Sequence, residues 1–95
     1  MAIESFRYRQ TEKIYHGLAV RRVDLNLQRR ARRKMRQIDA AIILEDLRVP
    51  PGNHLEKLRG DRSGQYSIRV NNQYRICFRW VDDKAYDVEF VDYHD

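Results

Sequence analysis

The strongest constraint on the fold is a stretch of alternating apolar and polar residues between positions 66 and 80. Residues 66–70 and residues 74–80 each alternate with a period of two, which is typical of strands that are buried on one face. Asn71 and Asn72 lie between the two segments, and asparagine tolerates the left-handed backbone that a tight hairpin turn requires. The pattern therefore predicts an antiparallel hairpin with one face against a core.

A second turn, at residues 82–84, leads to a third alternating segment in which Tyr86, Val88 and Phe90 are expected to share a face. Three consecutive strands of this kind predict an antiparallel meander that is apolar on the face packed by helices and polar on the other. The polar face is expected to lie away from the core and to present these side chains together: Ser67, Arg69, Arg75, Arg79, Asp87 and Glu89.

The first half of the chain predicts a short strand followed by helices. Residues 3–8 alternate weakly, as an edge strand does. Residues 11–16 are expected to form one or two helical turns, with Thr11 as the N-cap and Gly17 as the stop.

The longest helix is predicted by an apolar stripe with spacings of four, four, three and four residues. Asp24 or Asn26 can cap its start, and the stripe continues to Leu47 before Pro50 and Pro51 end it. We therefore expect one α/β domain of the α+β type over residues 1–95, with the N-terminal strand and two helices packed on the antiparallel sheet. The stripe consists of Leu27, Ala31, Met35, Ile38 and Ile42.

The net charge of +5 is unevenly distributed along the chain. Residues 1–48 hold twelve Lys and Arg against six Asp and Glu, whereas residues 80–95 hold one Lys against six acidic residues. A basic region of this kind favours a polyanionic partner such as nucleic acid. The alternative is a solvated surface that keeps a small protein soluble.

Several classes of protein are disfavoured by the sequence. The first ten residues are charged and lack the apolar core of a signal peptide, and no apolar run is long enough to span a membrane. Cys77 is the single cysteine, which excludes an internal disulfide and a cysteine-based zinc site. The three histidines lie 38 and 40 residues apart, without ligand spacing. We therefore expect a cytoplasmic chain with no membrane association, metal or cofactor.

Six cations within eight residues cover the polar faces of the long helix. Such a cluster can lie on phosphates or on an acidic or apolar groove of a partner, or it can be a solvated face. Like charges this close repel one another, and a partner would relieve that cost. The cluster consists of Arg29, Arg30, Arg32, Arg33, Lys34 and Arg36.

The remaining polar residues suit metal-independent cleavage of RNA. In that reaction a general base removes the proton of a ribose 2′-hydroxyl, cations stabilise the charge on the phosphorane, and an acid protonates the leaving oxygen. The ordinary pKa of a histidine such as His94 suits acid or base duty near neutral pH. Arg59 and Arg75 can supply fixed charge and bidentate phosphate contacts, and Tyr93 can stack on a base or take part in proton transfer.

Several motifs distributed along the chain resemble the HigB-type toxins, or plasmid-maintenance killer proteins, of the RelE/ParE toxin superfamily. The resemblance implies a microbial-RNase-like fold and cleavage of mRNA in the A site of the 70S ribosome, with contacts to 16S rRNA and without metal or cofactor. It also implies neutralisation by a small HigA-like helix-turn-helix antitoxin, and contact with operator DNA through that antitoxin alone. The motifs are Asp39-Ala40-Ala41, Pro50-Pro51-Gly52-Asn53, Leu58-Arg59-Gly60-Asp61-Arg62, Gln65-Tyr66-Ser67-Ile68, Gln73-Tyr74-Arg75-Ile76 and Asp92-Tyr93-His94.

The resemblance also implies which residues form the site. Some members of the family have a lysine at the position of Arg59 and a histidine at the position of Glu56. Because arginine stays protonated, charge stabilisation is the expected role of Arg59, and His54 can replace the missing histidine only if the loop bends back. The catalytic residues implied are Asp92, Tyr93, His94, Arg75 and Arg59. The expected contacts with RNA or the ribosome are Lys57, Arg62, Arg69 and Arg79, together with the six helix cations.

Two other functions remain open at this point. One is a non-enzymatic inhibitor, like the ParE branch that acts on DNA gyrase or like a factor that perturbs ribosomes by binding alone. The other is a module that binds its antitoxin and has no activity. The terminal Tyr93-His94 pair with Arg75 favours cleavage, because inhibition of gyrase does not need those groups.

Overall fold

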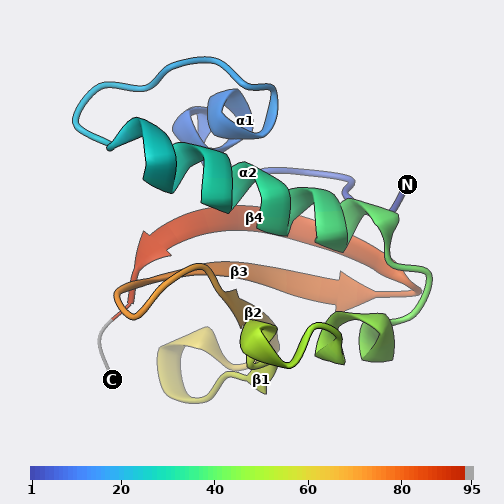
Figure 1. Ribbon diagram of the computed structural model, residues 1–95. Coiled ribbons are helices and arrows are strands. Elements are labelled where there is room, and N and C mark those ends of the chain that lie inside the picture. The colour runs from blue at the N-terminus through green and yellow to red at the C-terminus, as the bar shows by residue number, and fades with distance from the viewer. Residues whose placement is uncertain (94–95) are drawn as a thin grey trace.

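A four-stranded antiparallel sheet with the order β1-β2-β3-β4 carries two helices (Figure 1). The computed structural model describes residues 1–93. The predicted α+β architecture is confirmed. No helix within the described residues is long and apolar enough to cross a bilayer. In chain order the elements are α1 (Arg9–Tyr15), α2 (Leu25–Ala40), the 3-10 helices η1 (Leu44–Arg48) and η2 (Pro51–Asn53), β1 (Glu56–Lys57), the 3-10 helix η3 (Gly60–Arg62), β2 (Gln65–Arg69), β3 (Tyr74–Val81) and β4 (Lys84–Asp92).

The N-terminal segment is less regular than predicted. Residues 3–8 run beside β4 but meet it only in isolated bridges, Ile3 with Ala85 and Phe6 with Val88. Helix α1 starts two residues before Thr11, which is buried and accepts a hydrogen bond from Phe90 N (3.2 Å) instead of capping the helix. These contacts hold the segment and the start of α1 to β4.

Helix α2 packs its apolar stripe against the hydrophobic core, as predicted. Asp24 is the N-cap, since its Oδ2 accepts from Leu27 N at 3.2 Å. The helix ends at Ala40, so the prediction that it continues through Ile42 is wrong: Ile42 is 77% exposed. Asp46 Oδ2 accepts from the amides of Ile42 and Ile43, which starts η1 as a separate turn. These backbone hydrogen bonds hold the pKa of Asp46 below its usual value.

The turn between β2 and β3 differs from the predicted one, whereas the second turn joins β3 to β4 at the predicted position. Asn71 and Asn72 do not adopt a left-handed backbone; instead, Asn71 Oδ1 accepts from the amides of Gln73 and Tyr74 in a wider loop. The tight left-handed turn lies at Asp82 and Asp83, with φ angles of 50° and 60°. Aspartate provides the same local tolerance of positive φ as asparagine.

A bulge in β4 changes which residues share a face. The register between β3 and β4 shifts between Cys77 and Arg79, and Asp87 in the opposite strand has a φ of 55°. Because of the extra residue, Tyr86 pairs with Arg79, and its side chain lies on the other face of the sheet from that of Val88. The predicted common face of Tyr86, Val88 and Phe90 is therefore wrong for Tyr86.

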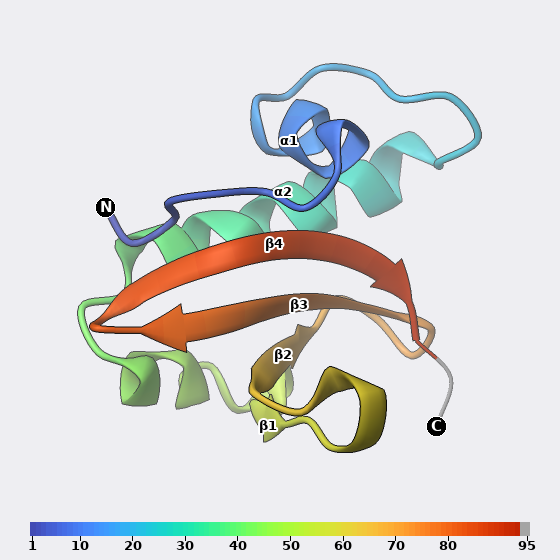
Figure 2. The same ribbon diagram turned by 180° about the vertical axis from the view of Figure 1, so that it is seen from behind.

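The polar face of the sheet is buried at its centre rather than exposed. β1, η3 and the loops around them lie on the opposite side of β3 from the helices in both views (Figures 1 and 2). Ser67 and Cys77 are fully buried, Glu89 is 2% exposed and Arg75 is 9% exposed. The segment from residue 54 to residue 64 thus turns the expected open surface into a polar interior.

Candidate functional site

Arg75 on β3 is the centre of this polar interior. Its Nε donates to Ser67 Oγ at 2.6 Å, and its Nη2 donates to His54 O and, at 3.4 Å, to Ser67 O. Ser67 is the diagonal neighbour of Arg75: the β2–β3 register pairs Arg75 with Arg69, and Ser67 lies two residues before Arg69 on the same face. Within residues 1–93, no hydrogen bond or ion pair engages Nη1. The guanidinium is therefore fixed on one side and has a free donor edge.

The backbone of His54 brings the loop before β1 to this arginine. His54 has a left-handed conformation (φ 44°, ψ 57°), which turns its carbonyl oxygen onto Arg75 Nη2. His54 was expected to contribute only if its loop bends back. The loop does bend back, and it brings the main chain of His54 to Arg75. The contact itself uses the carbonyl oxygen rather than the imidazole.

A cavity of about 220 Å³ opens beside Arg75. Two arginines and three amide side chains give it donors suited to phosphate oxygens, and one aromatic ring borders it. Sequence reasoning missed the amides, because the asparagines were interpreted as turn residues alone. The lining consists of Arg69, Asn71, Asn72, Gln73, Arg75 and Tyr93.

The end of β4 and the residue that follows it are anchored to the rim of this cavity. Tyr93 N donates to Gln73 O at 2.8 Å, and Gln73 Nε2 donates to Asp92 Oδ2 at 3.1 Å. The guanidinium of Arg75 lies 5.9 Å from the centre of the Tyr93 ring. Predicted site residues Asp92, Tyr93 and Arg75 are thus brought together. His94, also predicted for the site, lies outside the described residues.

A second arginine, Arg62, forms an ion pair with the buried carboxylate of Glu89 next to this cluster. Arg62 Nη1 donates to Glu89 Oε1 at 2.5 Å and to Gln65 Oε1 at 3.1 Å, and Arg7 Nη1 lies 3.5 Å from the same Glu89 oxygen. The hydrogen bond with Glu89 raises the pKa of Arg62 above its ordinary value. Arg62 therefore acts first as a structural partner for a carboxylate that is 2% exposed.

Cys77 fills the space between these polar groups. Burial raises the pKa of its thiol to about 11, so the sulfur is neutral at physiological pH. A neutral buried thiol is a poor nucleophile, and Cys77 packs as a small apolar residue.

A family model described as HigB-like toxin, the RelE-like toxin of the type II toxin–antitoxin system HigB, matches residues 4–94. The chain belongs to this family. The resemblance found in the sequence motifs is thereby confirmed.

Curated relatives agree with this placement. The toxin HigB-1 of Vibrio cholerae is 50% identical over 62 residues, which is 65% of this chain and 64% of the relative, so the chain matches somewhat less than two thirds of that protein. An uncharacterised protein of Haemophilus influenzae is 35% identical over 96% of this chain and 90% of its own length. The endoribonuclease HigB of Proteus vulgaris is 42% identical over 42% of this chain and 44% of that enzyme.

Solved structures share the fold of this HigB-family chain at low sequence identity. A chain of the YoeB-YefM complex from Staphylococcus aureus superposes with a TM-score of 0.62 and 17% identity, covering 100% of both chains. A heterotetrameric YoeB-YefM complex from the same organism gives the same TM-score at 18% identity.

Other cations predicted for the site, among them the predicted catalytic residue Arg59, do not line the cavity. Lys57 and Arg59 are exposed on the segment before η3, and no contact between Arg59 and Arg75 is recorded in the part of the chain that the structure describes. Arg79 is exposed and lies 3.5 Å from Asp87. The catalytic role of Arg59 and the RNA contacts of Lys57 and Arg79 remain predictions.

The six cations of α2 divide into two groups of three. Among the residues that the structure describes, Arg29, Arg33 and Arg36 make no hydrogen bond outside α2; Arg29 Nη1 donates only within the helix, to Asn26 Oδ1 at 3.5 Å. The other three donate hydrogen bonds to residues outside the helix, which ties α2 to its neighbours. Those contacts are Arg30 Nη2 with Val70 O at 3.0 Å, Arg32 Nε with Tyr15 O at 2.9 Å, and Lys34 Nζ with Asn53 Oδ1 at 2.6 Å.

Proposed function

We propose that this chain is the toxin of a type II toxin–antitoxin system and an endoribonuclease that cleaves mRNA in the ribosomal A site. The observation that carries the proposal is Arg75: a buried guanidinium, held by Ser67 and the His54 carbonyl, with a free edge toward a cavity bordered by Tyr93. Membership of the HigB-like toxin family and the relative named endoribonuclease HigB support the same chemistry.

The proposed reaction places the scissile phosphate in the cavity between Arg69 and Arg75. The free edge of Arg75 then donates to the phosphate oxygens that gain charge in the transition state, at no cost of reorganisation, because the guanidinium is already fixed. Tyr93 stacks on a base or positions the substrate. His94 follows Tyr93 in the sequence and is the group with the pKa suited to proton transfer.

Glu56 adds a second group for proton transfer. The β1–β2 register pairs Glu56 with Ser67, so its side chain lies on the same face of the sheet as the residue that orients Arg75. A carboxylate there can accept a proton from a 2′-hydroxyl. The substitution of glutamate for the histidine of some family members thus keeps a general base at this position.

The proposed partner is a small HigA-like helix-turn-helix antitoxin that reaches operator DNA and neutralises the toxin in the cytoplasm. The family description, which places the toxin in a type II toxin–antitoxin system, supports an antitoxin partner.

The test is to map the 5′ ends of cellular mRNA after brief induction of the chain without its antitoxin. We expect new ends within the coding regions of translated messages, positioned at A-site codons, and none when translation initiation is blocked beforehand. Growth arrest without new ends, accompanied by altered plasmid supercoiling, would instead identify an inhibitor of gyrase. Absence of growth arrest would identify a module that binds its antitoxin without activity.

A further inference from the structure

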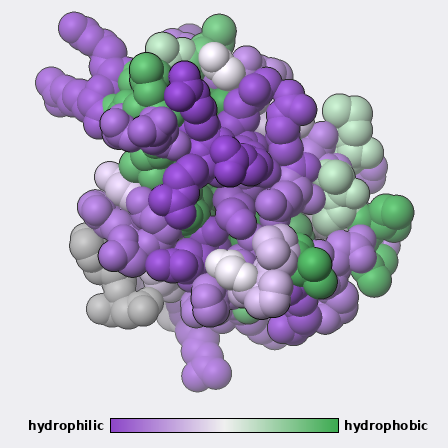
Figure 3. Space-filling view, in the orientation of Figure 1, coloured by the Kyte–Doolittle hydropathy of each residue, from purple (hydrophilic) through white to green (hydrophobic). Residues whose placement is uncertain are grey.

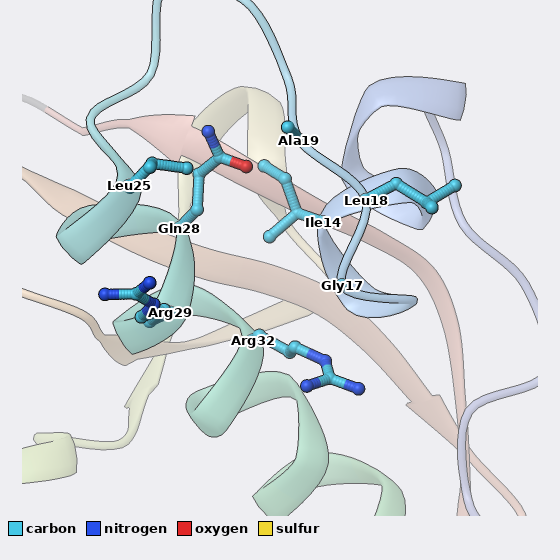
Figure 4. Close-up of a pocket in the computed structure, with 8 residues that line it drawn as sticks. All are labelled: Ile14, Gly17, Leu18, Ala19, Leu25, Gln28, Arg29 and Arg32. Atoms are coloured by element: carbon cyan, nitrogen blue, oxygen red, sulfur yellow. The ribbon is translucent and has the colours of Figure 1, made fainter.

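An open groove lies between the start of α2 and the loop that follows α1, on the helical side of the molecule (Figure 4). Its volume is about 220 Å³. Ile14 is buried in the floor, whereas Leu18 and Leu25 are each 56% exposed on its sides. The lining consists of Ile14, Gly17, Leu18, Ala19, Leu25, Gln28, Arg29 and Arg32.

A basic hollow of about 420 Å³ adjoins this groove along α2. Arg29 and Arg32 line both, so the two are continuous, and Arg33 and Arg36 extend the hollow along the helix. Over this end of the molecule, apolar side chains are bordered by hydrophilic ones (Figure 3). The result is an apolar groove that leads onto a row of arginines.

The arginines of this surface are not neutralised inside the chain. No ion pair among residues 1–93 involves any cation of α2. Burial lowers the pKa of Lys34, and the nearby charges of Arg30 and Arg33 lower it further. Carboxylates from outside would relieve this repulsion.

The combination of leucines and arginines favours a peptide over RNA as the occupant. Phosphates would pair with the arginines, but a nucleic-acid backbone offers nothing to the exposed leucines. An amphipathic helix buries its apolar face in such a groove and presents charges at its edge. Arg29, Arg33 and Arg36 follow the spacing i, i+4, i+7 over about 10 Å of helix, which acidic residues at matching spacing can meet.

We propose that this groove and the adjoining arginine row dock an acidic amphipathic segment of the antitoxin. The inference rests on the proposed function and names the surface through which that function is regulated. The groove lies on the helical side, whereas the segment that contacts Arg75 lies on the opposite side of β3 (Figure 1). The antitoxin segment therefore restrains the toxin by occupying the basic face of α2, and it leaves the Arg75 cavity uncovered.

The proposal is tested by titrating the purified HigA-like antitoxin into this chain by isothermal titration calorimetry. The groove variants are Leu25→Glu and the double variant Arg29→Glu/Arg33→Glu. Leu25 is the first residue of α2, where an acidic side chain favours the helix, so the fold should be kept. The matched controls are Ile42→Glu, an exposed apolar residue beyond the other end of α2, and Arg48→Glu, an exposed arginine on η1.

We expect each groove variant to bind the antitoxin at least tenfold more weakly than the wild type, and each control to bind within twofold, with equal thermal midpoints by circular dichroism. Groove variants that bind as tightly as the wild type would overturn the proposal. It would also fall if antitoxin affinity is unchanged while binding to 70S ribosomes is lost, because the face would then serve RNA.

A parallel assay of mRNA cleavage on programmed ribosomes separates this inference from the proposed function. If wild-type chain does not cleave but the groove variants lose antitoxin binding, the proposed activity fails and the docking surface stands. If wild-type chain cleaves and the groove variants bind antitoxin normally, the docking surface alone fails.

Discussion

The hydrogen bond from Arg75 to Ser67 offers the sharpest test of how the site is built. Both partners are buried, and the distance from Nε to Oγ is 2.6 Å. Ser67→Ala removes this single acceptor while the main-chain acceptors of Nη2, His54 O and Ser67 O, stay in place. The substitution changes the side-chain volume little, so packing is preserved.

The expected cost follows from the charge of the donor. A hydrogen bond to a charged group contributes about 1.5–3 kcal/mol, so Ser67→Ala should lower the free energy of unfolding by about 2 kcal/mol. For a domain of this size, that loss corresponds to a fall in Tm of roughly 8–16 °C. Urea unfolding followed by the fluorescence of Trp80, the one tryptophan, measures it. Ser63→Ala, at an exposed position, is the control and should change stability by less than about 0.5 kcal/mol.

A double-mutant cycle identifies the partner. Arg75→Met removes the guanidinium, and Ser67→Ala should cost little in that background, which gives a coupling energy of about 1.5–3 kcal/mol between the two positions. Additive effects, with a coupling below about 0.5 kcal/mol, would refute the claim that Ser67 holds Arg75.

Three further predictions concern the surroundings of the same cavity. Arg75→Lys should slow mRNA cleavage on programmed ribosomes by about 10²–10³-fold, because lysine keeps the charge but lacks the planar fork; an unchanged rate would contradict a phosphate-binding role. His54→Gly should leave both cleavage and urea stability intact, since glycine adopts φ 44° readily and the carbonyl contact with Arg75 remains; a large loss of rate with normal stability would assign a role to the imidazole. For Cys77, burial raises the thiol pKa from 9.0 to about 11, so the stability it contributes is present below pH 9 and is lost as the pH rises to 11. That loss should be about 2–3 kcal/mol and absent in Cys77→Ala when urea unfolding is compared across this range; equal slopes in both proteins would disprove it.

The alternation of the strands could be predicted from the sequence, but the covering of their polar face could not. Period two places Ser67, Arg75 and Glu89 on one side, and the structure keeps them there. What buries them is the left-handed turn at His54 and the two-residue strand β1, and neither produces a periodic pattern. Short elements that are fixed by backbone contacts have no periodic sequence pattern by which they could be predicted.

The errors in the predicted elements have similar local causes. Ile42 fits the apolar stripe of α2 by spacing, yet the carboxylate of Asp46 captures its amide and ends the helix first. The bulge at Asp87 inserts one residue into β4, which a strict alternation cannot reveal. In the same way, the sequence identifies six cations on α2 but not which three find acceptors outside the helix, because those acceptors belong to distant segments.

The polar interior explains why a small chain can hold a charged group ready for a phosphate. A buried guanidinium is costly unless its donors are satisfied, and within the described residues every buried side-chain nitrogen and oxygen has a partner. The pair of Arg62 with Glu89 neutralises one side of the face, while Ser67 and His54 O hold Arg75 without neutralising it. Arg75 therefore keeps its full charge toward the cavity. Gln73 also fastens Asp92 and the amide of Tyr93 to the same loop, so the Tyr93 ring is held at the rim of that cavity.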